Sequence, residues 1–191
     1  MTARIPPVRR ADADPRVEAE FRRIESLGGY VPNMHLTFGQ HPALYAAWLP
    51  FAVHVMPNST LSPRHRQLLI LRTSYAWRAP YPWAHHARIS KVVSDLGDAE
   101  IEATARELEL DEWSLFELAL LRACDETRSH GSIQEPTWRV LAGELDPRQL
   151  IDVAFAIGQY ALIATALNSL RVQLDEGFDT PAWAKDLGEH R

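Results

Sequence analysis

Apolar residues recur at helical spacing through most of the chain. On the segment 82–96, one side carries four residues at positions i, i+3, i+7 and i+10, namely His86, Ile89, Val93 and Leu96. Runs in which apolar and polar residues alternate are too short to predict a sheet. The pattern therefore predicts an all-α protein, a compact bundle of about seven to nine helices.

Local signals place the ends of these helices. A capping residue followed by proline starts three of them, at Asp14-Pro15, Ser62-Pro63 and Asp146-Pro147, and glycine ends others at Gly28 and Gly131. The predicted helices span 15–28, 42–56, 63–78, 82–96, 99–108, 112–129, 133–143 and 147–176. No linker divides the sequence, so we predict an N-terminal arm at 1–13, one helical domain at 14–177 and a C-terminal tail at 178–191, with Trp183 as its anchor.

The uncharged stretch from Val153 to Leu170 approaches the length of a transmembrane helix. It contains polar residues, among them Gln159, Tyr160 and Asn168. A helix that is apolar nearly all round is more simply a central core helix or a subunit-interface helix. We therefore predict no membrane partner.

Composition excludes several classes of function. The chain has 191 residues, of which 46% are hydrophobic, and a net charge of −5 with scattered basic residues, so no basic face is available for nucleic acid. The single cysteine, Cys124, excludes an intramolecular disulfide and any two-cysteine redox cycle within one chain. The N-terminus lacks the apolar segment of a secretion signal, so a cytoplasmic location is expected.

The candidate chemistry is concentrated between Arg66 and Val93, which are predicted to form two helices joined by a proline-rich elbow. His86 lies on the apolar side of the second helix, whereas His85 lies about 100° away around it. A lone inward-facing histidine is more often a satisfied core residue than a functional one. His86 is nevertheless a candidate, because other polar and aromatic residues that could bind a substrate lie on the same two helices. These residues are Gln67, Arg72, Tyr75, Arg78, Tyr81, Trp83 and His85.

The motif Tyr81-Pro82-Trp83-Ala84-His85-His86, with Leu61-Ser62-Pro63-Arg64 and the Leu68–Leu71 block, resembles the carboxymuconolactone decarboxylase and alkylhydroperoxidase D-like superfamily. The peroxidase branch has a Cys-x-x-Cys pair, a histidine four residues after it and a glutamate twelve residues before it. Here those positions hold Ala79, Pro82, His86 and Gln67, so the resemblance implies that the chain is not a cysteine-dependent peroxidase. The decarboxylase branch often has Tyr-Glu-Trp-x-x-His, in which Pro82 replaces the glutamate.

The resemblance implies a bundle of the alkylhydroperoxidase D-like type and homo-oligomers, as a dimer, trimer or hexamer. It also implies a small-molecule substrate and chemistry without a cofactor: a decarboxylase-type lyase or proton-transfer enzyme acting on a carboxylated lactone or a carbonyl-containing ring. His86 then serves as acid and base, because its pKa is ordinarily near neutrality. Its tautomer would be fixed by Gln67, Tyr75 or a water.

The remaining candidates are assigned to substrate binding. Arg72 and Arg78 can hold a carboxylate in plane, although a surface ion pair explains each as well. Gln67 can orient, and Tyr75, Tyr81, Trp83 and His85 can line a pocket, although aromatic residues at helical spacing are commonly plain core. No metal site is expected, because His85 and His86 point in different directions.

The competing hypothesis is a non-redox ligand-binding or catalytically inactive member of the same fold. Pocket geometry distinguishes the two hypotheses. An enclosed cavity touched by His86 and at least one arginine favours an enzyme, whereas a filled elbow favours a binding or structural role.

Overall fold

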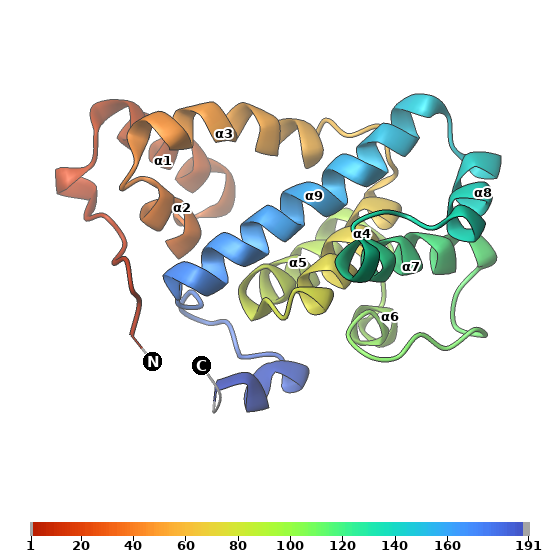
Figure 1. Cartoon of the computed structure of the whole chain (residues 1–191). Helices are drawn as coiled ribbons and strands as arrows, with labels where there is room; N and C mark the ends of the chain where they lie inside the picture. The colour runs from red at the N-terminus through yellow and green to blue at the C-terminus, as the bar shows by residue number, and fades with distance from the viewer. Residues whose placement is uncertain (1, 189–191) are drawn as a thin grey trace.

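The computed structural model describes residues 2–188, and within that range all regular structure is helical, with no strand (Figure 1). This confirms the predicted all-α class. The helices are η1 (Arg10–Asp12), α1 (Pro15–Gly28), α2 (Asn33–Phe38), α3 (Pro42–Val55), α4 (Pro63–Ala76), α5 (Pro80–Val93), α6 (Asp98–Ala103), α7 (Leu115–His130), α8 (Glu135–Glu144), α9 (Pro147–Leu170) and η2 (Ala182–Gly188). Met1 of the predicted arm and residues 189–191 of the predicted tail lie outside the described residues.

The capping signals at Ser62 and Asp146 work where the sequence placed them, but several other helix boundaries differ, among them those of α5, which spans 80–93 instead of 82–96, and of α8, which begins at Glu135 instead of 133. The Ser62 hydroxyl accepts a hydrogen bond from the His65 amide at 3.1 Å, and Asp146 caps α9. The helix predicted at 99–108 covers only α6, and α7 begins after Ser114 instead of Asp111 because Ser114 and Glu117 form a capping box. α9 ends at Leu170, before the predicted end at 176, because Arg171 adopts a left-handed conformation with φ of 54°.

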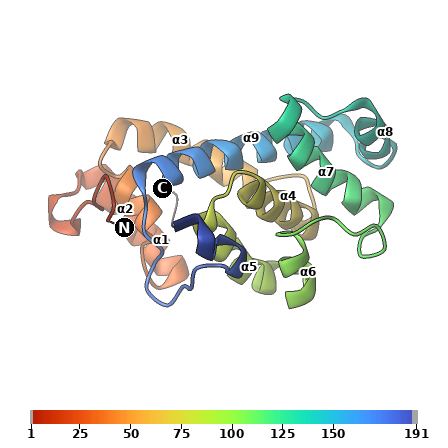
Figure 2. The same ribbon diagram turned by 60° about the horizontal axis from the view of Figure 1, so that its bottom comes forward.

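Helix α4 lies at the centre of the bundle. All nine residues from Arg66 to Ser74 are buried, because α5, α7 and α9 surround the helix (Figures 1 and 2). Leu69 and Ile70 pack in a core shared with α7 and α9, whereas Leu68 and Leu71 pack in a second core with Trp83. Two cores thus lie on opposite sides of one helix, and burial of their apolar side chains stabilises the bundle.

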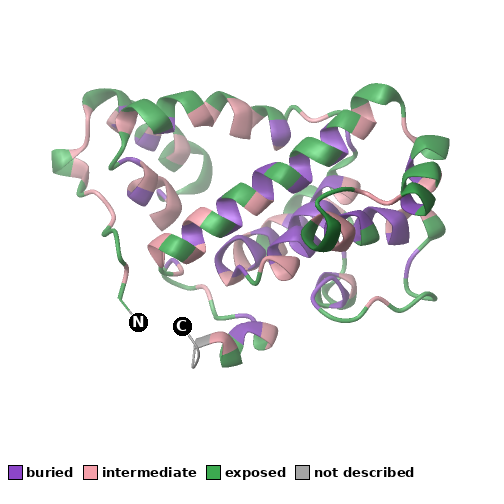
Figure 3. Cartoon of the chain, viewed as in Figure 1, coloured by how far each residue is buried: buried purple, intermediate pink, exposed green. Residues whose placement is uncertain are grey.

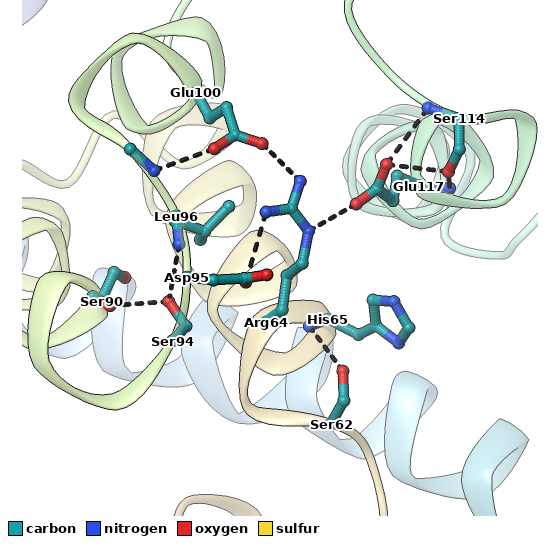
Figure 4. Close-up of polar contacts among 11 residues, drawn as sticks. Ser62, Arg64, His65, Ser90, Ser94, Asp95, Leu96, Glu100, Ser114 and Glu117 are labelled. Carbon is teal, nitrogen blue, oxygen red and sulfur yellow. Dashed lines mark hydrogen bonds and ion pairs between the residues drawn. The ribbon is translucent and has the colours of Figure 1, made fainter.

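An ion-pair network fixes the start of α4 against the outer helices. The guanidinium of Arg64 donates to Glu117 of α7 at 2.7 Å and to Glu100 of α6, and it lies 3.4 Å from Asp95 (Figure 4). Because one arginine is bonded to carboxylates on both α6 and α7, it fixes the positions of these two helices relative to α4. The network thus joins the first turn of α4 to α6 and α7.

The C-terminal segment returns to the bundle after α9. The ring of Trp183 lies edge-on to Tyr75 and Trp83, at centroid distances of 5.3 and 6.1 Å. Trp183 therefore anchors the tail, as the sequence suggested. Asp175 and Phe178, in the connection between α9 and η2, reach α5.

Helix α9 crosses the molecule with buried and exposed residues alternating along it (Figure 3). Among the described helices it alone is long and apolar enough to cross a membrane, and half of its apolar window is buried inside the protein. A core helix of a water-soluble bundle meets the same criteria of length and composition.

The exposed side of α9 carries an uncharged apolar stripe. Ile151, Phe155 and Leu162 are 57%, 53% and 55% exposed, and Asp152, the one charged residue between them, is turned inward. Contiguous exposed apolar surface of this kind is typical of interfaces between subunits. We therefore expect this protein to form at least a dimer at micromolar concentration, with α9 in the interface.

Light scattering tests this prediction. Phe155→Glu should lower the measured mass to that of one chain, because it places a charge in the stripe. Val92→Glu is the matched control, since Val92 is an exposed apolar residue on α5, outside the α9 stripe, and this variant should keep the wild-type mass. A wild-type protein with the mass of one chain would contradict the prediction.

Candidate active site

A cavity of about 270 Å³ lies between the N-terminal helices α1 to α3 and the helices α5 and α9. Its wall is mostly apolar, with Met34, Leu49, Val53, Ile89 and Ile163 among the lining residues. The polar or titratable residues that reach it are Arg23, His35, Trp48, Tyr81, His85, His86, Gln159 and Tyr160. Side chains therefore do not fill the space next to the elbow between α4 and α5 on the side that faces α1 to α3.

His86 is held at both ring nitrogens. Nδ1 lies 2.8 Å from Gln67 Oε1, and Nε2 lies 2.8 Å from the hydroxyl of Tyr160. A carbonyl oxygen can only accept, so Nδ1 carries the proton, and Nε2 accepts from the tyrosine hydroxyl. Ser90 also donates to Gln67 Oε1, at 3.2 Å, and helps to hold that amide. Residues from α4, α5 and α9 thus form one chain of hydrogen bonds, Tyr160–His86–Gln67.

Burial keeps this chain uncharged. His86 is 7% exposed, and burial lowers the pKa of its imidazole to about 3, with smaller contributions from the nearby His85 and Arg66 side chains. Burial also raises the pKa of the Tyr160 hydroxyl, while Arg66 acts against that rise. At neutral pH the site therefore holds a neutral imidazole facing a neutral phenol.

His85 faces a different partner at the edge of the cavity. Its ring is stacked between Tyr81 and Phe178, at centroid distances of 4.5 and 4.1 Å, and Nε2 lies 2.8 Å from Asp175 Oδ2 without the alignment of a hydrogen bond. Asp175 accepts hydrogen bonds from the Tyr81 hydroxyl at 2.6 Å and from the Asn33 amide at 2.7 Å. Burial works to raise the pKa of Asp175, but the His85 ring and these two donors hold it below its usual value. This cluster ties the C-terminal segment to α2 and α5.

Comparison with known proteins identifies the fold. The carboxymuconolactone decarboxylase family matches residues 42–126, which include Gln67 and His86. This match and the solved structures of the same fold support the resemblance to the carboxymuconolactone decarboxylase and alkylhydroperoxidase D-like superfamily. No curated protein matches the sequence.

Solved structures of the same fold cover nearly the whole chain. One is the alkylhydroperoxidase AhpD core of an uncharacterized peroxidase-related protein from Ralstonia eutropha JMP134, with a TM-score of 0.81, 16% identity and coverage of 91% of this chain and 93% of that one. Another is a variant of the debrominase Bmp8 in complex with 2,3,4-tribromopyrrole, with a TM-score of 0.77, 20% identity and coverage of 99% and 98%. A peroxidase-related protein from Silicibacter sp. TM1040 has a TM-score of 0.75, 17% identity and coverage of 91% and 94%. At these identities the likeness shows the fold alone.

Arg72 does not line the cavity. Its guanidinium pairs with Asp125 in plane, with Nε 2.9 Å from Oδ1 and Nη2 2.6 Å from Oδ2. It also donates to the backbone carbonyls of Thr104 and Arg106, at 3.0 and 2.6 Å. The expectation that Arg72 holds a substrate carboxylate is therefore corrected: its hydrogen-bonding capacity is used to join α4 to α7 and to the end of α6.

Three further candidates lie elsewhere. Tyr75 and Trp83 pack against Trp183, and the Trp83 indole lies 3.3 Å from the Thr104 hydroxyl, on the other side of α4. Arg78 has φ of 54° at the elbow and does not line the cavity. Of the sequence-derived candidates, Tyr81, His85 and His86 line the cavity, and Gln67 supports His86 from behind.

Sequence reasoning missed the contribution of α9. Gln159 and Tyr160 are polar residues in an otherwise apolar helix, and that contrast was the available signal. In the sequence analysis, Gln159 and Tyr160 were used only as evidence against a transmembrane helix. Their direction of approach depends on where α9 crosses α5, which the sequence pattern does not contain.

Cys124 cannot supply thiol chemistry to the cavity. Its side chain is fully buried in the core between α4 and α7, where Sγ lies 3.6 and 3.4 Å from the carbonyls of Leu69 and Leu120. Burial raises the pKa of the thiol to about 12, so no reactive thiolate forms at neutral pH. No group of three metal-ligating side chains occurs within residues 2–188 either.

We therefore expect no thiol-dependent consumption of hydroperoxide. The positions that the family resemblance assigns to a cysteine pair hold Ala79 and Pro82, and Cys124 is inaccessible. The measurement is peroxide loss in the presence of a dithiol, with wild-type protein and Cys124→Ser compared against buffer. Turnover by the wild type would contradict the expectation, and turnover that survives Cys124→Ser would assign it to other chemistry.

Proposed function

We propose that this protein is a cofactor-independent proton-transfer enzyme, of the isomerase or decarboxylating lyase type, that acts on a small carbonyl-containing ring. The observation that carries the proposal is the chain Tyr160–His86–Gln67 on the wall of a mostly apolar cavity. A held imidazole bonded to the hydroxyl of a tyrosine that lines the cavity is an arrangement suited to general acid and base catalysis. The substrate is a small molecule, and the working form is a homo-oligomer.

The lining favours a carbonyl-bearing ring over a carboxylated one. Arg72 is committed to Asp125, and Arg23 is the one arginine among the described lining residues. Arg23 pairs with Glu20 at 2.8 Å, and its side chain is 48% exposed, so it lies at the solvent side of the cavity. A free carboxylate deep in this apolar space would lack a partner, and burial of an unpaired charge is costly.

The proton moves along the hydrogen bonds already present. A carbon next to the substrate carbonyl gives its proton to the Tyr160 oxygen, while the Tyr160 proton passes to His86 Nε2. The electron pair of the broken C–H bond moves onto the carbonyl oxygen, which leaves an enolate opposite an imidazolium. Gln67 keeps the proton on Nδ1, so that Nε2 is the acceptor. Return of the proton to a different carbon completes an isomerisation.

The same groups serve decarboxylation. The C–C bond to the carboxylate breaks and CO₂ leaves, the electron pair moves onto the carbonyl oxygen, and Tyr160 delivers its proton to carbon. A proton taken up from water after the product leaves restores the Tyr160 hydroxyl. The low pKa of His86 makes the imidazole a weak base in the empty cavity. A developing enolate nearby stabilises the imidazolium and raises that pKa during the reaction.

The competing function is ligand binding without catalysis. His86 and one arginine, Arg23, line the cavity, which meets part of the criterion stated from the sequence, although Arg23 lies at the solvent side and pairs with Glu20. The debrominase of similar fold was solved with a one-ring ligand, 2,3,4-tribromopyrrole, which supports a ligand of that size here. It does not distinguish binding from turnover.

Hydrogen exchange into substrate carbon tests the proposal directly. Cyclic ketones, lactones and ring-bearing keto acids are incubated with the protein in D₂O, and mass spectrometry measures deuterium uptake next to the carbonyl and loss of CO₂. We expect uptake above the buffer rate, lost in Tyr160→Phe and kept in the control Tyr75→Phe, whose ring lies in the other core. Buffer-level exchange for every compound would favour the binding function, and a fully active Tyr160→Phe would contradict the proton path.

A further inference from the structure

A second cavity lies between the end of α9, the start of α5 and the C-terminal segment, and the proposed function does not use it. Its volume is about 480 Å³, larger than that of the candidate active site. Figure 1 shows η2 near the C-terminal end of α9, and residues of both helices line this space. We call it the outer cavity. Its wall is mixed, with Val172, Leu174 and Leu187 as apolar residues and Arg171 and Lys185 as cations.

The two cations have no partner in the protein. The guanidinium of Arg171 and the ammonium of Lys185 form no ion pair and donate no hydrogen bond to any described residue. Asp175, the buried carboxylate on the same segment, is already bonded to the Tyr81 hydroxyl and the Asn33 amide. Among the described residues, none that lines the outer cavity is acidic. The outer cavity therefore carries an uncompensated positive charge.

A ligand has access to both cations. Arg171 is partly exposed and Lys185 is exposed, and the three apolar residues Val172, Leu174 and Leu187 are partly exposed as well. The groups that would bind a ligand are thus on the surface of the cavity and not behind it. An occupant that contacts them gives up less water than one in the buried interior, so charge recognition here remains sensitive to salt.

Capping of α9 does not account for the charge of Arg171. A cation at the end of a helix commonly binds the last carbonyls. In α9 the carbonyls of Ser169 and Leu170 accept hydrogen bonds from the side chain and the amide of Arg4, at 3.0 and 2.9 Å. The two carbonyls before them accept from the backbone amides of Arg171 and Val172. All four terminal carbonyls are therefore satisfied without the guanidinium of Arg171.

The start of α5 adds to the positive potential of the outer cavity. Pro80 and Tyr81, the first two residues of α5, line it, and Ala79 before them provides no side-chain cap. The N-terminus of a helix has a partial positive charge, which stabilises a nearby anion. This end of α5 supplements the two cations, which carry the larger charge.

We propose that the outer cavity binds a small monocarboxylate with an apolar body, whose carboxylate pairs with Arg171 and Lys185 and whose body packs on Val172, Leu174 and Leu187. A guanidinium binds both oxygens of a carboxylate in plane, and an ammonium adds a point charge. The volume of about 480 Å³ lies within the range of roughly 300 to 1,000 Å³ for ligand pockets. The proposal is independent of the proposed function, because neither cation lines the candidate active site.

Four probes separate charge from apolar contact. 3-Phenylpropanoate and 3-phenylpropan-1-ol share the apolar body and differ in charge, whereas acetate and inorganic phosphate carry charge without the body. Dissociation constants come from protein NMR titrations of the full chain. We expect 3-phenylpropanoate to bind about tenfold more tightly than the alcohol, because its hydrogen bonds to the cations are charge-assisted. Acetate and phosphate should bind at least about tenfold more weakly than 3-phenylpropanoate, because they bury no apolar surface.

Variants of the two cations locate the site. Arg171→Gln and Lys185→Gln should each weaken binding of 3-phenylpropanoate and leave binding of the alcohol unchanged, and the double variant should abolish the preference for the acid. The melting temperature should change little, since neither side chain has a partner in the protein. Arg122→Gln is the matched control, because Arg122 is exposed on α7 and lines neither cavity. This variant should keep the tenfold preference.

Equal affinities for the acid and the alcohol would overturn the proposal, as would a preference that survives the double variant. Acetate or phosphate bound as tightly as 3-phenylpropanoate would overturn it too, because the apolar wall would then contribute nothing. Absence of 3-phenylpropanoate binding up to its solubility limit has the same consequence. If Arg171→Gln unfolds the chain, Lys185→Gln alone decides, since Lys185 is an exposed residue of η2.

Discussion

Replacing His86 by glutamine is expected to reduce turnover by about 10²- to 10⁴-fold, the range for loss of a positioned acid and base. The glutamine amide can still meet Gln67 or Tyr160 by a hydrogen bond, so the melting temperature should change little. A glutamine side chain cannot take up a proton at neutral pH, so the proton of Tyr160 has no acceptor. The measurement is the rate of deuterium uptake or CO₂ loss with the substrate found by screening, together with thermal unfolding.

His85→Gln is the matched control, since it makes the same change on the adjacent residue of the same helix. His85 is stacked between Tyr81 and Phe178 and faces Asp175, so its loss should lower the melting temperature and leave the turnover number nearly normal. The two variants should thus give opposite patterns. If His86→Gln mainly lowers the melting temperature and keeps activity, His86 is a structural histidine and the proton-transfer proposal is wrong.

Acidification is expected to destabilise the protein well above the range in which carboxylates titrate. Burial lowers the pKa of His86 to about 3 and that of His35 to about 4, whereas both titrate near 6.5 in the unfolded chain. Between these values the unfolded state binds more protons than the folded state, so the free energy of unfolding falls as pH falls below about 6.5. By pH 4.5 each histidine should have cost on the order of 2 to 3 kcal/mol.

Urea unfolding at several values between pH 7 and about pH 4.5 measures this slope. His86→Gln and His35→Gln should each reduce the slope, because each removes one group that binds a proton only when the chain unfolds. His130→Gln is a control, since His130 is exposed at the end of α7. A free energy of unfolding that stays constant over this pH range would show that the two imidazoles are not held neutral by burial.

Much of the scaffold follows from local sequence. The recurrence of His86, Ile89 and Val93 on one side of a helix placed the imidazole toward the interior, and the structure has it 7% exposed. The capping residues Ser62 and Asp146 begin α4 and α9 as predicted, because a cap and the proline after it act within one turn. Gln67, anticipated as one of three possible partners for His86, is bonded to it. These features depend on neighbours in sequence, which the pattern of residues records.

The site itself was decided by tertiary packing. Tyr160 lies 74 residues after His86 and meets it only because α9 crosses α5, and it takes the place for which Tyr75 had been considered. Arg72 was a reasonable carboxylate ligand by residue type, but Asp125 lies within reach once α7 packs on α4 and saturates the guanidinium. Helical periodicity fixes the face on which a side chain lies, whereas its partner depends on how helices pack across the core, and that is a property of the folded chain alone.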